Sequence, residues 1–195
     1  MRRRSVLLSA VSGALTGALA LGRSNEVAAR QATSTLADHP LTGDWMAMAN
    51  RPPPGSPQVP APSHFGADGS VLLVFPPTQV GMQGVEFVSP YLGTWEADSD
   101  RRGHFTATQL LSDASGAFLG SVTVDGYPEV SEDGQTFVDD GSKVMVTIRD
   151  ATGAVVQQIP GAGAPPVTGI RMTPGVPGFP EGGAAGTPVG GTPTS

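Results

Sequence analysis

The side chains best able to do acid–base or metal chemistry in this sequence are three imidazoles, His39, His64 and His104. His64 and His104 each precede a phenylalanine, in segments where apolar and polar residues alternate as in a β-strand. Successive side chains of a strand point to opposite faces, so one member of each His-Phe pair faces inward. Two inward histidines could transfer a proton or bind a metal together. We expect them to face solvent instead, and no His-x-His or His-Glu-x-x-His spacing supports a zinc site.

Other residue types give catalysis less support. The chain has no cysteine, and it lacks the Gly-x-Ser-x-Gly turn that exposes a nucleophilic serine. Acidic residues gather in turn-forming segments without the spacing and closing glutamate of a calcium loop. Nothing places Glu86 and Glu96 together, as a glycosidase requires. We therefore predict no catalytic residue, no metal site and no cofactor. The alternative is a barrel-type cyclase or isomerase with a buried polar group. Its residues would be His64, His104, Arg149 and Glu96.

Apolar side chains give a stronger indication of function. In the first strand-like segment, Ala47 and Ala49 alternate with larger methionines. Small inward residues leave room, and barrels of about eight strands can hold one small ligand. Long loops over residues 51–62 and 76–90 would surround the mouth of such a barrel. The candidate ligand-binding residues, in the interior or at its mouth, are Trp95, Phe105, Phe118, Met145, Phe75, Phe87, Tyr91, His64 and His104. An ordinary filled core is the alternative, because cores and pockets are both mainly apolar.

The elements that must position these residues are strands. No segment between residues 36 and 173 shows sustained helical periodicity, and turn residues separate short alternating segments. Short connections favour antiparallel pairing, because parallel strands need long crossovers. The predicted strands cover residues 41–50, 63–65, 70–75, 91–97, 104–111, 117–124, 135–138, 143–149, 154–159 and 167–172. We predict an all-β fold: a single antiparallel up-and-down β-barrel of about 8–10 strands over residues 41–173, because closure removes exposed edges.

Two strands begin alike, with Gly43-Asp44-Trp45 and Gly93-Thr94-Trp95, and Arg171 lies in the last predicted strand. This arrangement resembles the lipocalin-like, or calycin, β-barrels. The resemblance implies that Gly43, Trp45 and Arg171 form a structural floor. The indole of Trp45 would close one end of the barrel, and the guanidinium of Arg171 would lie over it. A guanidinium over an indole face contributes about 0.5–2 kcal/mol.

The N-terminal segment has the pattern of an export signal. Three arginines, Arg2 to Arg4, precede a mildly apolar run that is too short to cross roughly 30 Å of hydrocarbon comfortably. Arg3-Arg4-Ser5-Val6-Leu7 resembles the bacterial twin-arginine signal, which implies export of an already folded protein. We expect a signal over residues 1–29, a flexible segment over 30–40 and a disordered Gly/Pro/Thr tail over 174–195. The general secretory route and an uncleaved membrane anchor are the alternatives.

Charge limits the partners of the secreted chain. Removing residues 1–29 takes away four arginines and one glutamate, so the formal net charge of −6 becomes −9. Phosphate backbones are bound through Lys and Arg, so we expect no nucleic acid as a partner. We also expect no stable membrane insertion once the signal is removed. The leading hypothesis is a secreted, extracytoplasmic β-barrel that binds a small apolar or amphipathic molecule in its interior. The alternatives are the barrel enzyme above and an extracellular surface interaction module.

Overall fold

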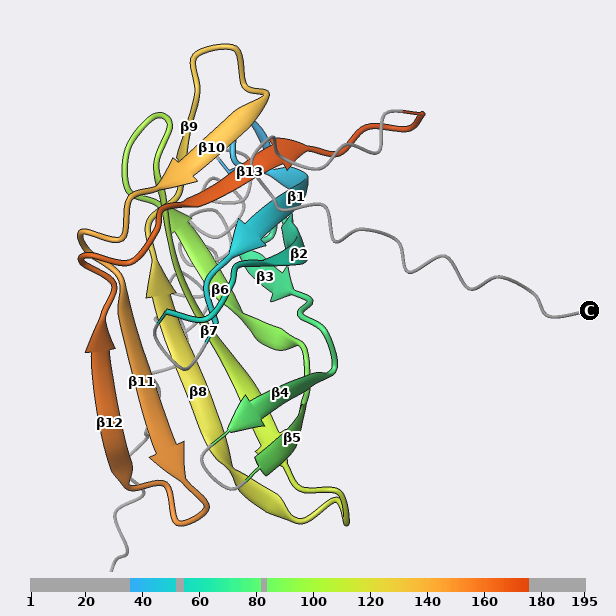
Figure 1. Ribbon diagram of the computed structural model, residues 1–195. Helices are drawn as coiled ribbons and strands as arrows, with labels where there is room; N and C mark the ends of the chain where they lie inside the picture. The colour runs from blue at the N-terminus through green and yellow to red at the C-terminus, as the bar shows by residue number, and fades with distance from the viewer. Residues whose placement is uncertain (1–35, 52–54, 82–83, 176–195) are drawn as a thin grey trace, which may run out of the picture.

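The computed structural model describes residues 36–51, 55–81 and 84–175, which form one antiparallel sheet (Figure 1). The predicted signal over residues 1–29 lies outside this part of the chain, as does most of the predicted tail. The strands are β1 (Gly43–Ala49), β2 (Val59–Phe65), β3 (Ser70–Leu73), β4 (Thr78–Gly81), β5 (Gly84–Val88), β6 (Tyr91–Ala97), β7 (Gly103–Ser112), β8 (Phe118–Gly126), β9 (Glu129–Val130), β10 (Thr136–Asp139), β11 (Met145–Asp150), β12 (Val155–Pro160) and β13 (Val167–Arg171). In the described residues, no helix is long and apolar enough to cross a membrane.

The sheet curls into a half-barrel. Its strand order is β12-β11-β8-β7-β6-β3-β2-β1-β13-β10-β9, and the β4–β5 hairpin joins it where β5 pairs with β7. At one end the curl closes, because β9 meets the start of β7. There Arg102 and Glu129 form an antiparallel bridge, and the Gly103 N–H donates to the Pro128 carbonyl over 3.0 Å. The predicted antiparallel all-β fold is confirmed.

Burial alternates along the strands and places the core inside the curl. In β2, Ala61 and Phe65 are buried, whereas Pro62 and His64 are exposed. This period of two is the signature of a sheet with one solvated face. The buried set includes Trp45, Phe65, Val71, Trp95, Ala107, Val122 and Phe137. In the segment expected to be flexible, Leu36 packs against this core and His39 is buried, and the residue after the segment, Leu41, is fully buried.

The sheet has more strands than predicted, because β4 and β5 lie within the predicted loop 76–90 and β9 lies between the predicted strands 117–124 and 135–138. The other predicted loop is partly strand as well. β2 begins at Val59, inside the proline-rich segment 51–62. The Pro62 carbonyl accepts from the Val74 N–H, so the backbone groups of Pro62 point toward β3. By alternation those of Pro60 point the same way, beyond the end of β3. Proline has no backbone N–H to donate, but at Pro60 and Pro62 that N–H would not have pointed toward β1. All hydrogen bonds between β2 and β1 can therefore form, which explains how prolines fit this strand.

The second predicted loop, residues 76–90, contains the β4–β5 hairpin. The sequence did not predict this hairpin, because its strands are only four and five residues long and Pro76, Pro77 and Gly81 lie within or next to them. Together with the lower parts of β7, β8, β11 and β12, this hairpin forms the open end of the half-barrel (Figure 1).

Candidate functional site

The closed end of the half-barrel has a floor made by Trp45 and Arg171. β1 and β13 are neighbours, and Trp45 is the register partner of Arg171. The guanidinium carbon of Arg171 lies 4.2 Å from the centroid of the Trp45 ring. Trp45 is completely buried and donates its indole N–H to the Leu41 carbonyl over 2.8 Å. Phe137 packs edge-on against the same indole, with ring centroids 5.2 Å apart.

Backbone carbonyls hold the Arg171 side chain in place. Its Nε donates to the Gly134 carbonyl over 2.7 Å, and its Nη1 donates to the Thr42 carbonyl over 3.0 Å. Its Nη2 donates to the Pro40 carbonyl. Partial burial lowers the pKa of Arg171, although an arginine stays charged in proteins. A side chain at Gly43 would press on the guanidinium, because a Cβ there would lie 2.9 Å from Nη1. Gly43 and Trp45 therefore both lie against the guanidinium of Arg171.

A second tryptophan extends the floor. The Trp95 indole N–H donates to the Gly66 carbonyl over 2.8 Å, and its ring packs edge-on against Phe65 and His39. His39 is buried: its Nδ1 accepts from the Leu41 N–H and its Nε2 donates to the Ser99 carbonyl. The sequence did not indicate that His39 is buried, because it precedes the first strand and its partners, Trp95 and Ser99, are distant in the chain.

Above the floor, the half-barrel contains a cavity of about 180 Å³. One wall consists of small residues, namely Ala47 and Ala49 on β1 and Ala61 and Ser63 on β2. Ala47 pairs directly with Ala61 across the two strands. Aromatic and aliphatic side chains form most of the rest. These lining residues include Phe65, Leu73, Phe75, Tyr91, Phe105, Val124, Phe137, Val146, Ile159 and Val167. The cavity is therefore largely apolar.

Two glycines let aromatic rings lie flat against the sheet. A Cβ on Gly169 would come within 2.3 Å of the Phe137 ring, and a Cβ on Gly126 would come equally close to the Phe105 ring. Any larger residue at either position would push a ring into the cavity. The backbone at Gly126 and Gly169 thus sets the width of the space above the floor.

Hydrogen bonds tie the mouth of the cavity together. The Asn50 side chain donates to the Pro165 carbonyl over 2.6 Å, and the Gln58 side chain donates to the Pro166 carbonyl over 2.9 Å. The same Gln58 amide also reaches the Asn50 side-chain oxygen over 3.2 Å. This latch connects β1 and β2 to the segment between β12 and β13. Its two side chains are separated from their acceptors by more than a hundred residues, so local sequence patterns do not reveal it.

One carboxylate lies in the cavity wall. Asp139 is buried, and its oxygens accept from the backbone N–H groups of Tyr127, over 2.6 Å, and Gly141, over 3.1 Å. Burial raises the pKa of Asp139, although the two backbone hydrogen bonds oppose this shift. This carboxylate fastens the β8–β9 corner to the end of β10.

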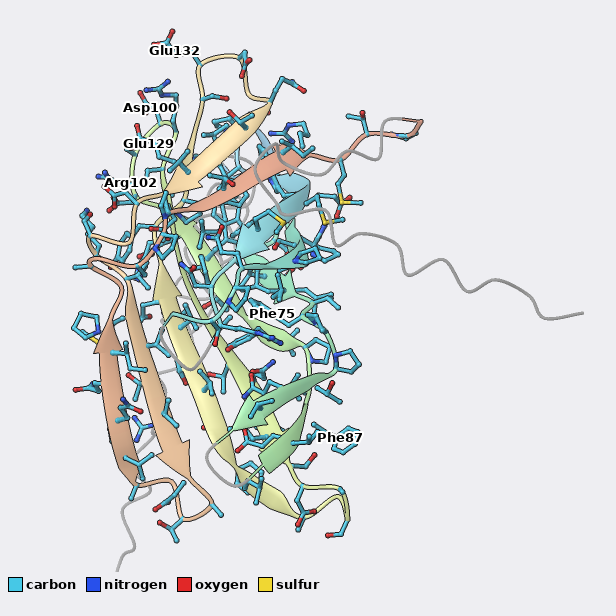
Figure 2. The ribbon with its side chains drawn as sticks, viewed as in Figure 1. Phe75, Phe87, Asp100, Arg102, Glu129 and Glu132 are labelled. Carbon is cyan, nitrogen blue, oxygen red and sulfur yellow. The ribbon has the colours of Figure 1, made fainter. Side chains whose placement is uncertain are left out.

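Only part of the predicted ligand-binding set lies in the cavity. Phe75, Tyr91 and Phe105 line it. Trp95 belongs to the floor instead, and Met145 is half-buried on β11 without lining the cavity. Phe87 and Phe118 are 43% and 50% exposed. Figure 2 shows Phe75 within the curl of the sheet and Phe87 pointing away from it.

Both strand histidines lie on the outer face. His64 forms a 2.8 Å contact with Asp44. His104 stacks on Tyr127, with ring centroids 4.5 Å apart, and approaches Glu96. Their phenylalanine neighbours face inward, as the alternation requires. The barrel-enzyme alternative needs polar side chains that meet inside the curl. The structure does not bring its four candidates together there: His64, His104, Glu96 and the exposed Arg149.

A charged cluster covers the outside of the closed end, where Figure 2 labels Arg102, Glu129 and Glu132. The Arg102 Nε lies 2.6 Å from Asp98, and this bond lowers the pKa of Asp98. Arg101 reaches both Glu129 and Glu132, at 3.6 and 3.9 Å. The arginines thus contact carboxylates on both sides of the bridge that closes the curl, and the cluster supports that closure.

Comparisons of this chain with protein-family models, with curated proteins and with solved structures give no match.

Proposed function

We propose that this protein binds one small apolar or amphipathic molecule in the cavity above the Trp45–Arg171 floor. The observation that carries the proposal is an apolar space of about 180 Å³ inside a half-barrel whose floor is closed. An engineered cavity of about 150 Å³ with an apolar lining stays dry and binds benzene. A ligand of one or two rings therefore matches this volume. Hydrophobic transfer supplies the binding free energy, at about 25 cal/mol for each Å² of apolar surface removed from water.

The small-residue wall provides the sharpest test. Ala61 is buried in the cavity wall, so Ala61→Leu inserts a side chain into the space a ligand would take. Thr94→Leu is the matched control, because Thr94 is exposed on the outer face of β6. We expect an apolar fluorescent probe and native mass spectrometry to detect one bound molecule in the wild type and in Thr94→Leu. Ala61→Leu should lose at least tenfold in affinity. Equal binding by Ala61→Leu, or no binding by the wild type, would contradict the proposal.

The finer resemblance to lipocalin-like barrels is also a proposal. Its support is the contact of Arg171, from the last strand, with Trp45, from the first. Secretion by the twin-arginine route is supported by Arg3-Arg4-Ser5-Val6-Leu7 alone. Replacing both Arg3 and Arg4 by Lys should retain the full-length chain inside the cell, whereas replacing Arg23 and Arg30 should not. Undiminished export of the first variant would exclude that route.

A further inference from the structure

Most polar side chains around the cavity already have a hydrogen-bond partner. Asn50 donates to Pro165, the Ser63 hydroxyl donates to the Ala61 carbonyl over 2.9 Å, and Asp139 accepts from two backbone N–H groups. Arg51 lies at the mouth and is only half-buried. These groups are satisfied by the protein or have access to water, so they do not require a ligand.

Tyr91 differs from these groups. It lines the cavity and is only 4% exposed, yet its hydroxyl forms no hydrogen bond with any residue in the described part of the chain. Among the described residues, no fully enclosed side-chain nitrogen or oxygen lacks a partner. The Tyr91 hydroxyl is therefore not sealed in the core, and the residue that carries it lines the cavity. Its ring is held by Phe75, with centroids 5.3 Å apart.

The protonation state of Tyr91 defines what it offers. Burial raises the pKa of the Tyr91 phenol, so the group stays neutral at physiological pH and keeps its proton. A neutral phenol donates one hydrogen bond and can accept others. A ligand that fills the cavity excludes water from this hydroxyl, and an unpaired buried polar group costs free energy, so a ligand that supplies the partner avoids that cost.

We propose that the cavity selects a neutral, compact ring compound that carries one hydrogen-bonding oxygen, such as a ketone, and that the Tyr91 hydroxyl donates to this oxygen. This inference rests on the proposed function and names its ligand class. The Asp139 carboxylate, which also lines the cavity, disfavours a ligand with its own negative charge there. The apolar remainder of the lining disfavours a second polar group on the ligand, which would lose water without gaining a partner.

A pair of probes of nearly equal shape tests the inference. Ethylbenzene and acetophenone differ mainly by the carbonyl oxygen, and benzoate adds a charge. Their affinities are measured by calorimetry on the wild type, on Tyr91→Phe and on Tyr127→Phe. The last variant is the matched control, because Tyr127 is the other tyrosine of the chain and stacks on the outward-facing His104.

We expect Tyr91→Phe to weaken acetophenone binding about tenfold, the effect of one neutral hydrogen bond. Ethylbenzene should bind both proteins alike, and Tyr127→Phe should change neither affinity. Dividing the effect of Tyr91→Phe on acetophenone affinity by its effect on ethylbenzene affinity corrects for changes in packing that weaken both ligands. If both probes bind and Tyr91→Phe affects them equally, the inference is wrong while the proposed function stands. Preferred binding of benzoate that is insensitive to Tyr91→Phe would also overturn it. If no probe binds the wild type, the proposed function itself fails.

Discussion

The two ends of the half-barrel are built differently. At the closed end, Trp45 and Arg171 bury their polar atoms against backbone carbonyls, and β9 meets β7. At the open end, β12 exposes nearly all of its side chains. Among the described residues, β12 pairs only with β11, and β4 pairs only with β5. The comparison indicates that the closed end supplies stability, whereas the open end leaves the curl incomplete beside the cavity.

The largest expected effect is at the floor. Trp45→Ala removes a fully buried indole, and such truncations cost about 3–5 kcal/mol. Val156→Ala is the counterpart at the open end; Val156 is 50% exposed, so the free energy of unfolding should change by no more than about 0.5 kcal/mol. Urea denaturation of both variants measures the difference. Similar losses for the two would refute the division between a stabilising and a permissive end.

Arg171→Met should rank second. It leaves the carbonyls of Pro40, Thr42 and Gly134 without their donor, and an unsatisfied buried polar group costs about 1–3 kcal/mol. Arg149→Met is the control, because among the described residues the exposed Arg149 side chain forms a hydrogen bond only with the Gly153 carbonyl. Thermal unfolding of the two variants distinguishes them. A midpoint for Arg171→Met equal to that of Arg149→Met would show that the guanidinium is dispensable.

A smaller effect is expected at the latch. Asn50→Ala loses the bond to the Pro165 carbonyl and should cost about 0.5–1.5 kcal/mol. Because the latch ties the cavity mouth together, the bound probe should also dissociate faster from this variant in stopped-flow displacement. Gln158→Ala, on the exposed β12, is the control. Unchanged stability together with unchanged dissociation would exclude a role for the latch.

The smallest effect concerns the β11–β12 turn at low pH. The Asp150 carboxylate accepts from the Thr152 hydroxyl and from the Thr152 and Ala154 N–H groups, and these bonds lower its pKa. A folded-state pKa below the unfolded value of about 3.9 means that the turn is fully supported above that pH. The support is lost as pH falls through the folded-state pKa. Hydrogen exchange of the β12 amides should therefore accelerate below about pH 4 relative to those of β1. An Asp150→Asn variant that retains this acceleration would point to another group.

Several turns follow the same local chemistry, which explains why they were predictable. Asp68, Asp113, Asp140 and Asp150 each accept a hydrogen bond from the backbone N–H two residues later. A side chain that bonds its own near neighbours leaves a signature within a few residues. The hairpins at Asp68, Asp113 and Asp150, and the turn at Asp140, could therefore be predicted without knowledge of the sheet.

The cavity was less predictable. Phe105 and Phe118 occur in similar alternating segments, yet the first lines the cavity and the second is exposed at the open end. Periodicity states which side of a strand a residue occupies. It does not state how far along the barrel the residue lies or what covers it. The prediction of a loop over residues 51–62 was partly wrong for a related reason. Whether a proline interrupts a strand depends on where the neighbouring strand ends, and the local sequence does not show this.

The sequence by itself determined the all-β class, the antiparallel pairing and the inward side of most strands, because alternation and turn chemistry act over a few residues. The resemblance to lipocalin-like barrels, which rests on Gly43, Trp45 and Arg171, implied that the guanidinium lies over the indole, and the two side chains are in contact. Only the tertiary structure decided the buried role of His39, the latch at Asn50 and the position of the Tyr91 hydroxyl. Each of these depends on how far the sheet curls and on which distant segments it brings together, and no local pattern encodes either.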